Sequence, residues 1–118
     1  MAYPPVNIVN STSYSVSGSV NYASAFCSND NYGMGPNQPW TASGRGVCLV
    51  TEITANVQTP GGSVSATPYT SSGTSYSQFA VIQTSDNPLA FDVTRRVSLA
   101  TEDAPPADYK EPTTQQKK

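Results

Sequence analysis

The side chains that usually transfer protons or bind metals are scarce in this chain. It has no histidine among 118 residues, and its only two cysteines are Cys27 and Cys48. Histidine is the usual general base near neutral pH and the usual partner of a serine or cysteine nucleophile, so a catalytic cysteine paired with histidine is excluded. Two cysteines without histidine also cannot fill a tetrahedral zinc site.

Carboxylates are the remaining candidates for acid–base chemistry. Before the C-terminal stretch the chain offers four of them: Asp30, Glu52, Asp86 and Asp92. Glycoside hydrolysis needs two carboxyl groups that face each other across a cleft, and nothing in the spacing of these four favours such a pair. Glycine motifs that hold phosphate groups are missing as well. We therefore expect a protein that is not an enzyme.

A run of oxygen-bearing side chains, Asn29, Asp30 and Asn31, precedes Gly33 and could hold calcium. The alternative is that Asn and Asp stand here because they suit turns. The run lacks a second carboxylate, so turn geometry is the preferred interpretation. We expect no cofactor, with calcium as a weaker alternative.

The same region has the only tryptophan, Trp40, and a tyrosine, Tyr32. An aromatic face ringed by amides suits a sugar or the edge of an amphipathic ligand. Trp40 could equally be the tryptophan that sandwich folds often bury in the core, and Arg45 could bind a ligand carboxylate or pair with Glu52. The predicted ligand-binding residues are Tyr32, Trp40, Asn29, Asp30, Asn31, Asn37, Gln38 and Arg45.

Cys27 and Cys48 enclose this polar segment and have two interpretations. As a disulfide they would staple the segment at both ends, contributing roughly 3 kcal/mol by closing the loop. As reduced thiols they would be small core residues. A segment this polar lacks apolar anchors of its own, which favours the disulfide.

Strands are the elements that must position these residues, because no window shows the apolar periodicity of a helix. From Ser13 to Tyr22 the apolar and serine positions alternate, which predicts a strand with one wet face. Gly18 lies on the apolar face of that strand and indicates a bulge or the close approach of another side chain. Further strands are expected at 6–10, 39–42, 46–57, 63–70, 74–84 and 89–99.

In the strand predicted at 46–57, the alternation places Leu49 and Ile53 on one face and Cys48, Val50 and Glu52 on the other.

Turn signals separate the strands. Thr59 to Gly62 and Ser85 to Pro88 carry the Pro, Gly, Asn and Asp residues of turns. Ser71 to Gly73 predicts a tight hairpin between the strands at 63–70 and 74–84, and Pro68 suits an edge strand. Asn10, Ser11 and Thr12 form both a predicted turn and a glycosylation sequon.

About seven short strands with frequent turns predict an all-β fold, a single antiparallel β-sandwich. It resembles an immunoglobulin-like architecture in strand pattern alone, and a small β-barrel is the alternative. Residues 1–100 form the expected domain. After Ala100 the composition shifts to Glu, Asp, Pro, Gln and Lys, which predicts a flexible tail at 101–118.

Charge and termini limit the partners. The net charge is −2, and only 12% of the residues are charged. Nucleic-acid binding depends on Lys and Arg, and the body of the chain has three arginines, so no nucleic-acid partner is expected. No signal peptide or transmembrane segment is visible. The compartment stays open, with an extracellular or surface location favoured.

Three functions remain open. The first is a non-enzymatic, lectin-like module that binds carbohydrate or another cell-surface ligand through loops around Tyr32 and Trp40. The second is a structural subunit that assembles with copies of itself through strand edges and terminal tails. The third is a membrane-active β-protein.

Overall fold

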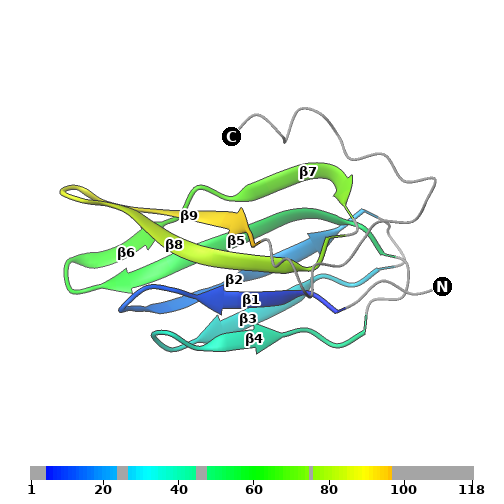
Figure 1. Ribbon diagram of the computed structural model, residues 1–118, viewed down its shortest axis with the longest axis horizontal. Coiled ribbons are helices and arrows are strands. Elements are labelled where there is room, and N and C mark those ends of the chain that lie inside the picture. Colours follow the sequence, from blue (N-terminus) through cyan, green and yellow to red (C-terminus); the bar gives the residue numbers. More distant parts are fainter. Residues whose placement is uncertain (1–4, 24–26, 45–47, 75, 97–118) are drawn as a thin grey trace.

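The computed structural model describes residues 5–23, 27–44, 48–74 and 76–96, and these residues form nine strands (Figure 1). The predicted tail at 101–118 lies outside them. The strands are β1 (Asn7–Asn10), β2 (Ser15–Tyr22), β3 (Asp30–Met34), β4 (Pro39–Thr41), β5 (Val50–Thr59), β6 (Gly62–Ser65), β7 (Tyr69–Thr74), β8 (Gln78–Asp86) and β9 (Leu89–Arg95).

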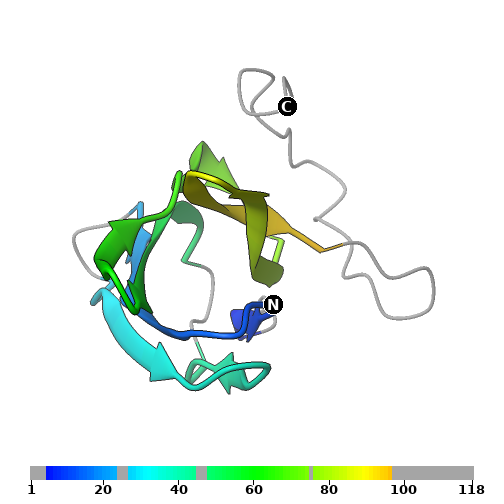
Figure 2. The same ribbon diagram turned by 90° about the vertical axis from the view of Figure 1, so that its left-hand side faces the viewer.

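The strands form two sheets that face each other around a common interior (Figure 2). One sheet has the order β4-β1-β8-β9, and the other has the order β3-β2-β5-β6, with β7 also pairing with β5. The predicted β-sandwich is confirmed. The prediction of purely antiparallel pairing is wrong at one ladder, because β1 and β8 run parallel. The chain enters β8 beside the start of β1, where the Asn7 amide donates to the Ser77 carbonyl at 2.7 Å.

The alternative of a small closed barrel is not formed. Within the described ranges, no strand ladder joins β3 to β4. On the opposite side, a single bridge between Thr67 and Asp92 links β9 to the segment between β6 and β7. No helix occurs among the described residues, so none of them forms a helix long and apolar enough to cross a membrane.

The core confirms the predicted alternation in β2. Val16 and Val20 are buried, whereas Ser15 and Ser17 are exposed. These valines join other side chains between the sheets, including Ile8, Ile53, Val57, Phe79, Val81 and Phe91.

The strict alternation expected for β5 is wrong at Val50. This residue is fully buried with Ile53, although its parity places it on the opposite face. The β2–β5 register shifts beside Asn21 and Tyr22, where Glu52 and Val50 are successive partners. One extra residue at a β-bulge reverses the parity of the strand beyond it.

Two strands exceed the predicted seven. The first is β3, which lies inside the polar segment. The second is β7, because Pro68 separates it from β6. The predicted hairpin at Ser71 to Gly73 is wrong, since these residues lie within β7, which pairs with β5. Gly73 adopts φ 138° where the β5–β7 ladder is irregular. The residues that resemble a turn in sequence therefore form a distorted part of a strand. The turns at 59–62 and 85–88 are confirmed as β5–β6 and β8–β9 hairpins.

Gly18 confirms the predicted close approach. A Cβ at this position would collide with the Thr54 carbonyl and lie 2.8 Å from the hydroxyl of Tyr32. The Tyr32 ring crosses β2 over Gly18, and its hydroxyl donates to the Thr54 carbonyl at 2.6 Å. Glycine is therefore required here for space, since the Thr54 carbonyl and the Tyr32 hydroxyl occupy the volume that a Cβ would need.

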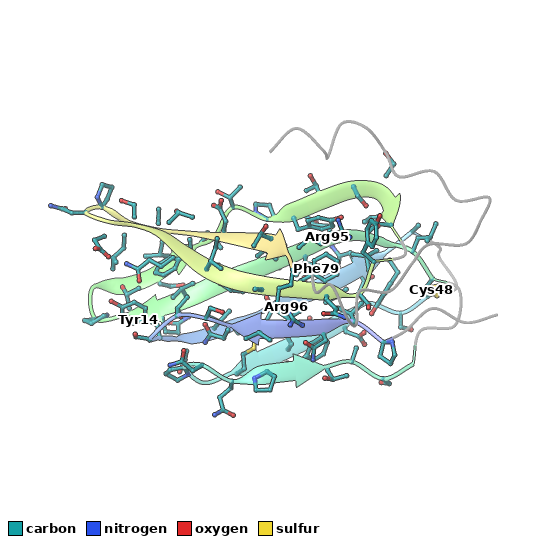
Figure 3. The ribbon with its side chains drawn as sticks, viewed as in Figure 1. Tyr14, Cys48, Phe79, Arg95 and Arg96 are labelled. Carbon is teal, nitrogen blue, oxygen red and sulfur yellow. A yellow bond between two sulfur atoms is a disulfide. The ribbon has the colours of Figure 1, made fainter. Side chains whose placement is uncertain are left out.

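Polar side chains tie the other sheet together across its strands. Arg96 donates from Nε to the Phe79 carbonyl at 2.8 Å and from its guanidinium to Asn7 Oδ1. Asn7 in turn donates from Nδ2 to Thr41 Oγ1 at 2.7 Å. This chain of contacts runs from the end of β9 over β8 and β1 to β4. Its neighbour Arg95 (Figure 3) stacks over the ring of Tyr76, with Cζ 3.5 Å from the ring centroid.

Asn10 is a fully buried amide whose hydrogen-bonding groups are all used. Its Nδ2 donates to the carbonyls of Tyr14 at 2.6 Å and Gly35 at 2.9 Å. Its Oδ1 accepts from the backbone N–H of Thr12 at 3.0 Å and from the Thr12 hydroxyl at 2.7 Å. The side chain therefore joins the turn after β1 to the turn between β3 and β4. The sequon at this position has its asparagine inside the fold, away from solvent.

We expect Asn10→Ala to lower the free energy of unfolding by about 3 kcal/mol or more, because it leaves several buried polar groups without a partner. Urea unfolding followed by circular dichroism measures this difference. Asn56→Ala is the matched control, since Asn56 is exposed and accepts a hydrogen bond from the Ser65 hydroxyl at 3.1 Å. That control should stay within about 0.5 kcal/mol of the wild type. Equal effects of the two substitutions would contradict the role of Asn10.

Candidate functional site

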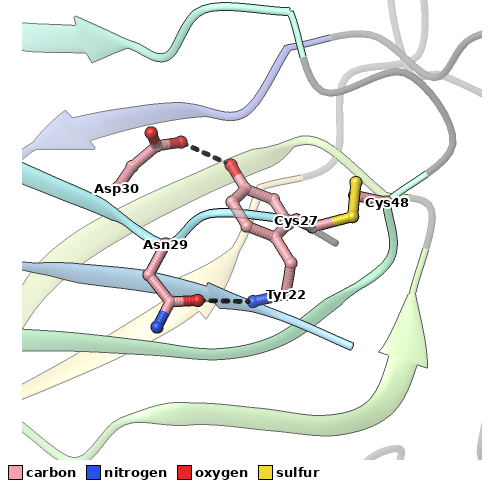
Figure 4. Close-up of a disulfide and its surroundings, with 5 residues drawn as sticks. All are labelled: Tyr22, Cys27, Asn29, Asp30 and Cys48. Carbon is pink, nitrogen blue, oxygen red and sulfur yellow. Dashed lines mark hydrogen bonds between the residues drawn. A yellow bond between two sulfur atoms is a disulfide. The ribbon is translucent and has the colours of Figure 1, made fainter. Parts of the chain in front are cut away.

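One end of the sandwich is closed by a disulfide between Cys27 and Cys48 (Figure 4). Their Cα atoms lie 6.2 Å apart across a sequence separation of 21 residues. Both cysteines are half-buried, and the enclosed segment contains β3 and β4. The predicted disulfide is confirmed. It holds the chain before β3 against the chain before β5.

Beside the disulfide lies a cavity of about 300 Å³. The end of β2, the start of β3, the segment after β4 and the two cysteines supply its walls. In Figure 3, Cys48 and Tyr14 mark opposite ends of the sandwich, so the cavity lies far from the Asn10 turn. Its lining residues are Tyr22, Cys27, Ser28, Asp30, Ser43, Gly44 and Cys48.

Tyr22 and Asp30 both line this cavity and are hydrogen-bonded to each other (Figure 4). The Tyr22 side chain is only 9% exposed, and its hydroxyl donates to Asp30 Oδ2 at 2.7 Å. Its backbone N–H donates to Asn29 Oδ1 at 3.3 Å. Two contacts therefore hold the last residue of β2 against the start of β3.

The Asp30 carboxylate keeps unused acceptor capacity. Among the described residues, its Oδ1 has no hydrogen-bond partner, while Oδ2 is occupied by Tyr22. Ser28 and Ser43 are exposed at the same cavity, and each hydroxyl can donate or accept. The arrangement suits recognition of a ligand with several hydroxyl groups. The described lining holds one carboxylate, whereas glycoside hydrolysis uses two.

The predicted aromatic pair is brought together but faces the interior. Tyr32 is 5% exposed and belongs to the core. Trp40 is half-buried and packs on Tyr32, with ring centroids 5.2 Å apart and planes inclined by 35°. Trp40 pairs with the fully buried Ile8 in the β1–β4 ladder. The alternative in which Trp40 packs against the core therefore describes its position better than a fully exposed platform does.

The other predicted ligand-binding residues lie in different parts of the structure and do not form one site. Asn29 and Asp30 lie at the disulfide end, whereas exposed Asn37 and Gln38 lie in the turn that contacts Asn10. Asn37 adopts φ 59°, a conformation that asparagine tolerates. Asn31 is exposed on β3. Arg45 lies outside the described residues.

The calcium alternative depended on a loop at 29–31. Asp30 and Asn31 instead begin a strand, so their side chains leave on opposite faces. Asn29 and Asp30 both direct an oxygen to Tyr22. The three side chains therefore do not converge on one point.

Four lining residues were not among the predicted ones: Tyr22, Ser28, Ser43 and Gly44. A signal for Tyr22 existed, because it is the last apolar-face residue of a clear strand and precedes Cys27 by five positions. A disulfide draws the flanks of both cysteines together, so Tyr22 and Ser28 could have been assigned to its surroundings. Ser43 and Gly44 carried no such signal.

Comparisons with family models, with characterised proteins and with solved structures return no match to this chain.

Reduction of the disulfide should lower the free energy of unfolding by roughly 3 kcal/mol, because the unfolded chain regains the freedom of the closed loop. Guanidinium unfolding with and without a phosphine reductant measures the change. The Cys27→Ser, Cys48→Ser double variant is the control, since the chain has no other cysteine. The free energy of unfolding of this double variant should equal that of the reduced protein and should not change when the reductant is added. An unchanged midpoint on reduction would contradict a stabilising disulfide.

Burial raises the pKa of the Tyr32 phenol well above its ordinary value. The unfolded chain therefore loses this proton near pH 10 while the folded chain retains it, so stability is complete below pH 10 and falls as the pH rises further. The loss attributable to this group reaches about 1.4 kcal/mol per pH unit. Tyr32→Phe should show a shallower decline above pH 10, measured by urea unfolding from pH 8 to pH 11.5. Identical slopes would contradict the assignment.

Proposed function

We propose that the protein is a non-enzymatic binding module that takes a carbohydrate at the cavity beside Cys27 and Cys48. The observation that carries the proposal is the Asp30 carboxylate, which lines the cavity and is held by the Tyr22 hydroxyl through Oδ2, while Oδ1 has no hydrogen-bond partner within the described part of the chain. The site thus moves from the predicted Tyr32–Trp40 pair to the disulfide end. Of the predicted ligand-binding residues, Asp30 lines this cavity, and Asn29 accepts a hydrogen bond from the Tyr22 N–H beside it.

The cavity has the features that a sugar ring requires. Its volume of about 300 Å³ is at the lower limit for small-molecule pockets, which favours one ring rather than a long chain. A carboxylate accepts hydrogen bonds from sugar hydroxyls, and the Ser28 and Ser43 hydroxyls supply both donors and acceptors. The Tyr22 ring offers an apolar surface for the C–H face of the ring.

Preorganisation supports the same proposal. The disulfide and the two Tyr22 hydrogen bonds fix the walls before any ligand arrives. A fixed site loses little conformational entropy on binding. Disulfides persist in oxidising compartments, which favours a cell-surface or extracellular glycan as the ligand.

Binding to a glycan array, followed by calorimetric titration with the best monosaccharide, tests this function. Asp30→Asn should weaken binding at least about tenfold, because it replaces a charged acceptor by a neutral amide. Asp86→Asn is the matched control, since Asp86 is an exposed acid in the β8–β9 hairpin that accepts from Gln83 Nε2 at 2.6 Å. Its affinity should equal that of the wild type.

Far-ultraviolet circular dichroism of both variants should overlay that of the wild type. Absence of binding to every glycan, or equal affinities of the two variants, would overturn the proposal.

A further inference from the structure

Most lateral strand edges of the sandwich are protected against pairing with another chain. On one edge, β4 has three residues and begins with Pro39, which has no N–H to donate. The outer side of β9 is occupied at its centre, where Thr67 donates to the Phe91 carbonyl and accepts from the Val93 N–H, both at 2.9 Å. The edge made by β6 and β7 is divided by Pro68, and β7 pairs irregularly with β5. Short, bulged or proline-bearing edges resist unwanted pairing.

The edge at β3 has none of these protections. Its five residues pair with β2 without a register shift, and they include no proline and no basic side chain. Asp30 at its start is the single charged residue. Among the described strands, β3 is therefore the edge best suited to accept a further strand.

The outward backbone groups of β3 follow from the hydrogen bonds of β2. Alternate residues of a strand direct both backbone polar groups to the same side. The Tyr22 N–H reaches Asn29, on the β3 side, whereas the Ser19 N–H reaches Thr54, on the β5 side. Even-numbered residues of β2 therefore bond to β3. In the observed register their partners are Asp30, Tyr32 and Met34.

The N–H and C=O groups of Asn31 and Gly33 consequently point to the side of β3 opposite β2. The next outward position, Gly35, is already engaged, because its carbonyl accepts from Asn10 Nδ2 at 2.9 Å and from the Gln38 N–H at 3.2 Å. Within the described part of the chain, the outward positions of β3 without a hydrogen-bond partner are thus Asn31 and Gly33, which together carry two donors and two acceptors.

We propose that this edge pairs with the same edge of a second copy of the chain, antiparallel, with the two-fold axis at Tyr32. Asn31 then lies opposite Gly33 of the partner subunit, and the reverse pair forms by symmetry. The two donors and two acceptors of each chain then pair with those of the other chain, which gives four backbone hydrogen bonds in total. A two-fold contact of this kind is self-complementary and closes at two copies.

Charge and shape favour this occupant over an unrelated strand. Asp30 lies opposite Met34 of the partner subunit, so the only charge on each edge does not meet its own copy. The space above Gly33 is open, since a Cβ there would have only the Val16 carbonyl within 4 Å, at 3.9 Å. The Asn31 side chain of one copy covers that space on the other. This pairing does not depend on the carbohydrate site proposed at the cavity.

The mass of the full chain in solution tests the proposal. Sedimentation velocity from micromolar to about millimolar concentration should show a species of twice the 12.4 kDa chain mass. Asn31→Pro removes one outward N–H and no bond to β2, so it should weaken the dimer at least about tenfold. Asn31→Ser is the matched control, because it keeps the backbone donor and should leave the dimer intact. A monomer at every concentration, or equal dimerisation of both variants, would overturn the proposal.

A cross-linking experiment tests the register without a proline. Asn31→Cys and Gly33→Cys are prepared separately, mixed and oxidised mildly. Directly opposite residues in an antiparallel pair lie within disulfide distance. The mixture should therefore yield a covalent dimer of one copy of each variant, whereas each variant alone should yield far less. Equal cross-linking in the mixture and in the separate samples would overturn the register.

Discussion

The buried amide of Asn10 is the contact on which the arrangement of both sheets depends. A buried amide must satisfy two donors and two acceptors, and here every partner comes from a turn: Thr12, Tyr14 and Gly35. The first turn leads from β1 into β2, and the second leads from β3 into β4. Each turn carries the chain from one sheet to the other. One side chain therefore sets the separation of the sheets at two crossings, which a purely apolar residue could not do.

The two ends of the sandwich are closed by different means. The Asn10 end is sealed by hydrogen bonds that leave no unused capacity in that amide. The opposite end is held by a covalent bond between Cys27 and Cys48. A cavity remains beside the sulfur atoms, and polar groups such as the Asp30 carboxylate can face it. Loops and cavities at the end of a rigid β-scaffold are common places for recognition.

Local sequence patterns predicted the structural features that depend on residues close in the chain. They did not predict the features that depend on contacts between distant segments. The alternation from Ser13 to Tyr22 predicted the buried face of β2, and the crowding at Gly18 was also foreseen. The polar composition around Asn31 concealed β3, because pairing with β2 and the Tyr32 ring over Gly18 make a strand of residues that favour turns. Ser71 to Gly73 resembled a hairpin for the same reason. The cavity joins three segments through the disulfide, so spacing along the chain identified Asp30 but not Ser43.

The parallel ladder between β1 and β8 has a consequence for how the protein is made. Asn7 pairs with Gln78, so the first strand finds its central partner only after most of the domain has been synthesised. The hairpins of the other sheet can form earlier, because β2, β3, β5 and β6 pair over shorter distances in sequence. Contacts of high sequence separation slow folding, since a long loop must close first. During translation β1 can therefore pair with β4 first, and its second edge gains its partner only after β8 has been synthesised.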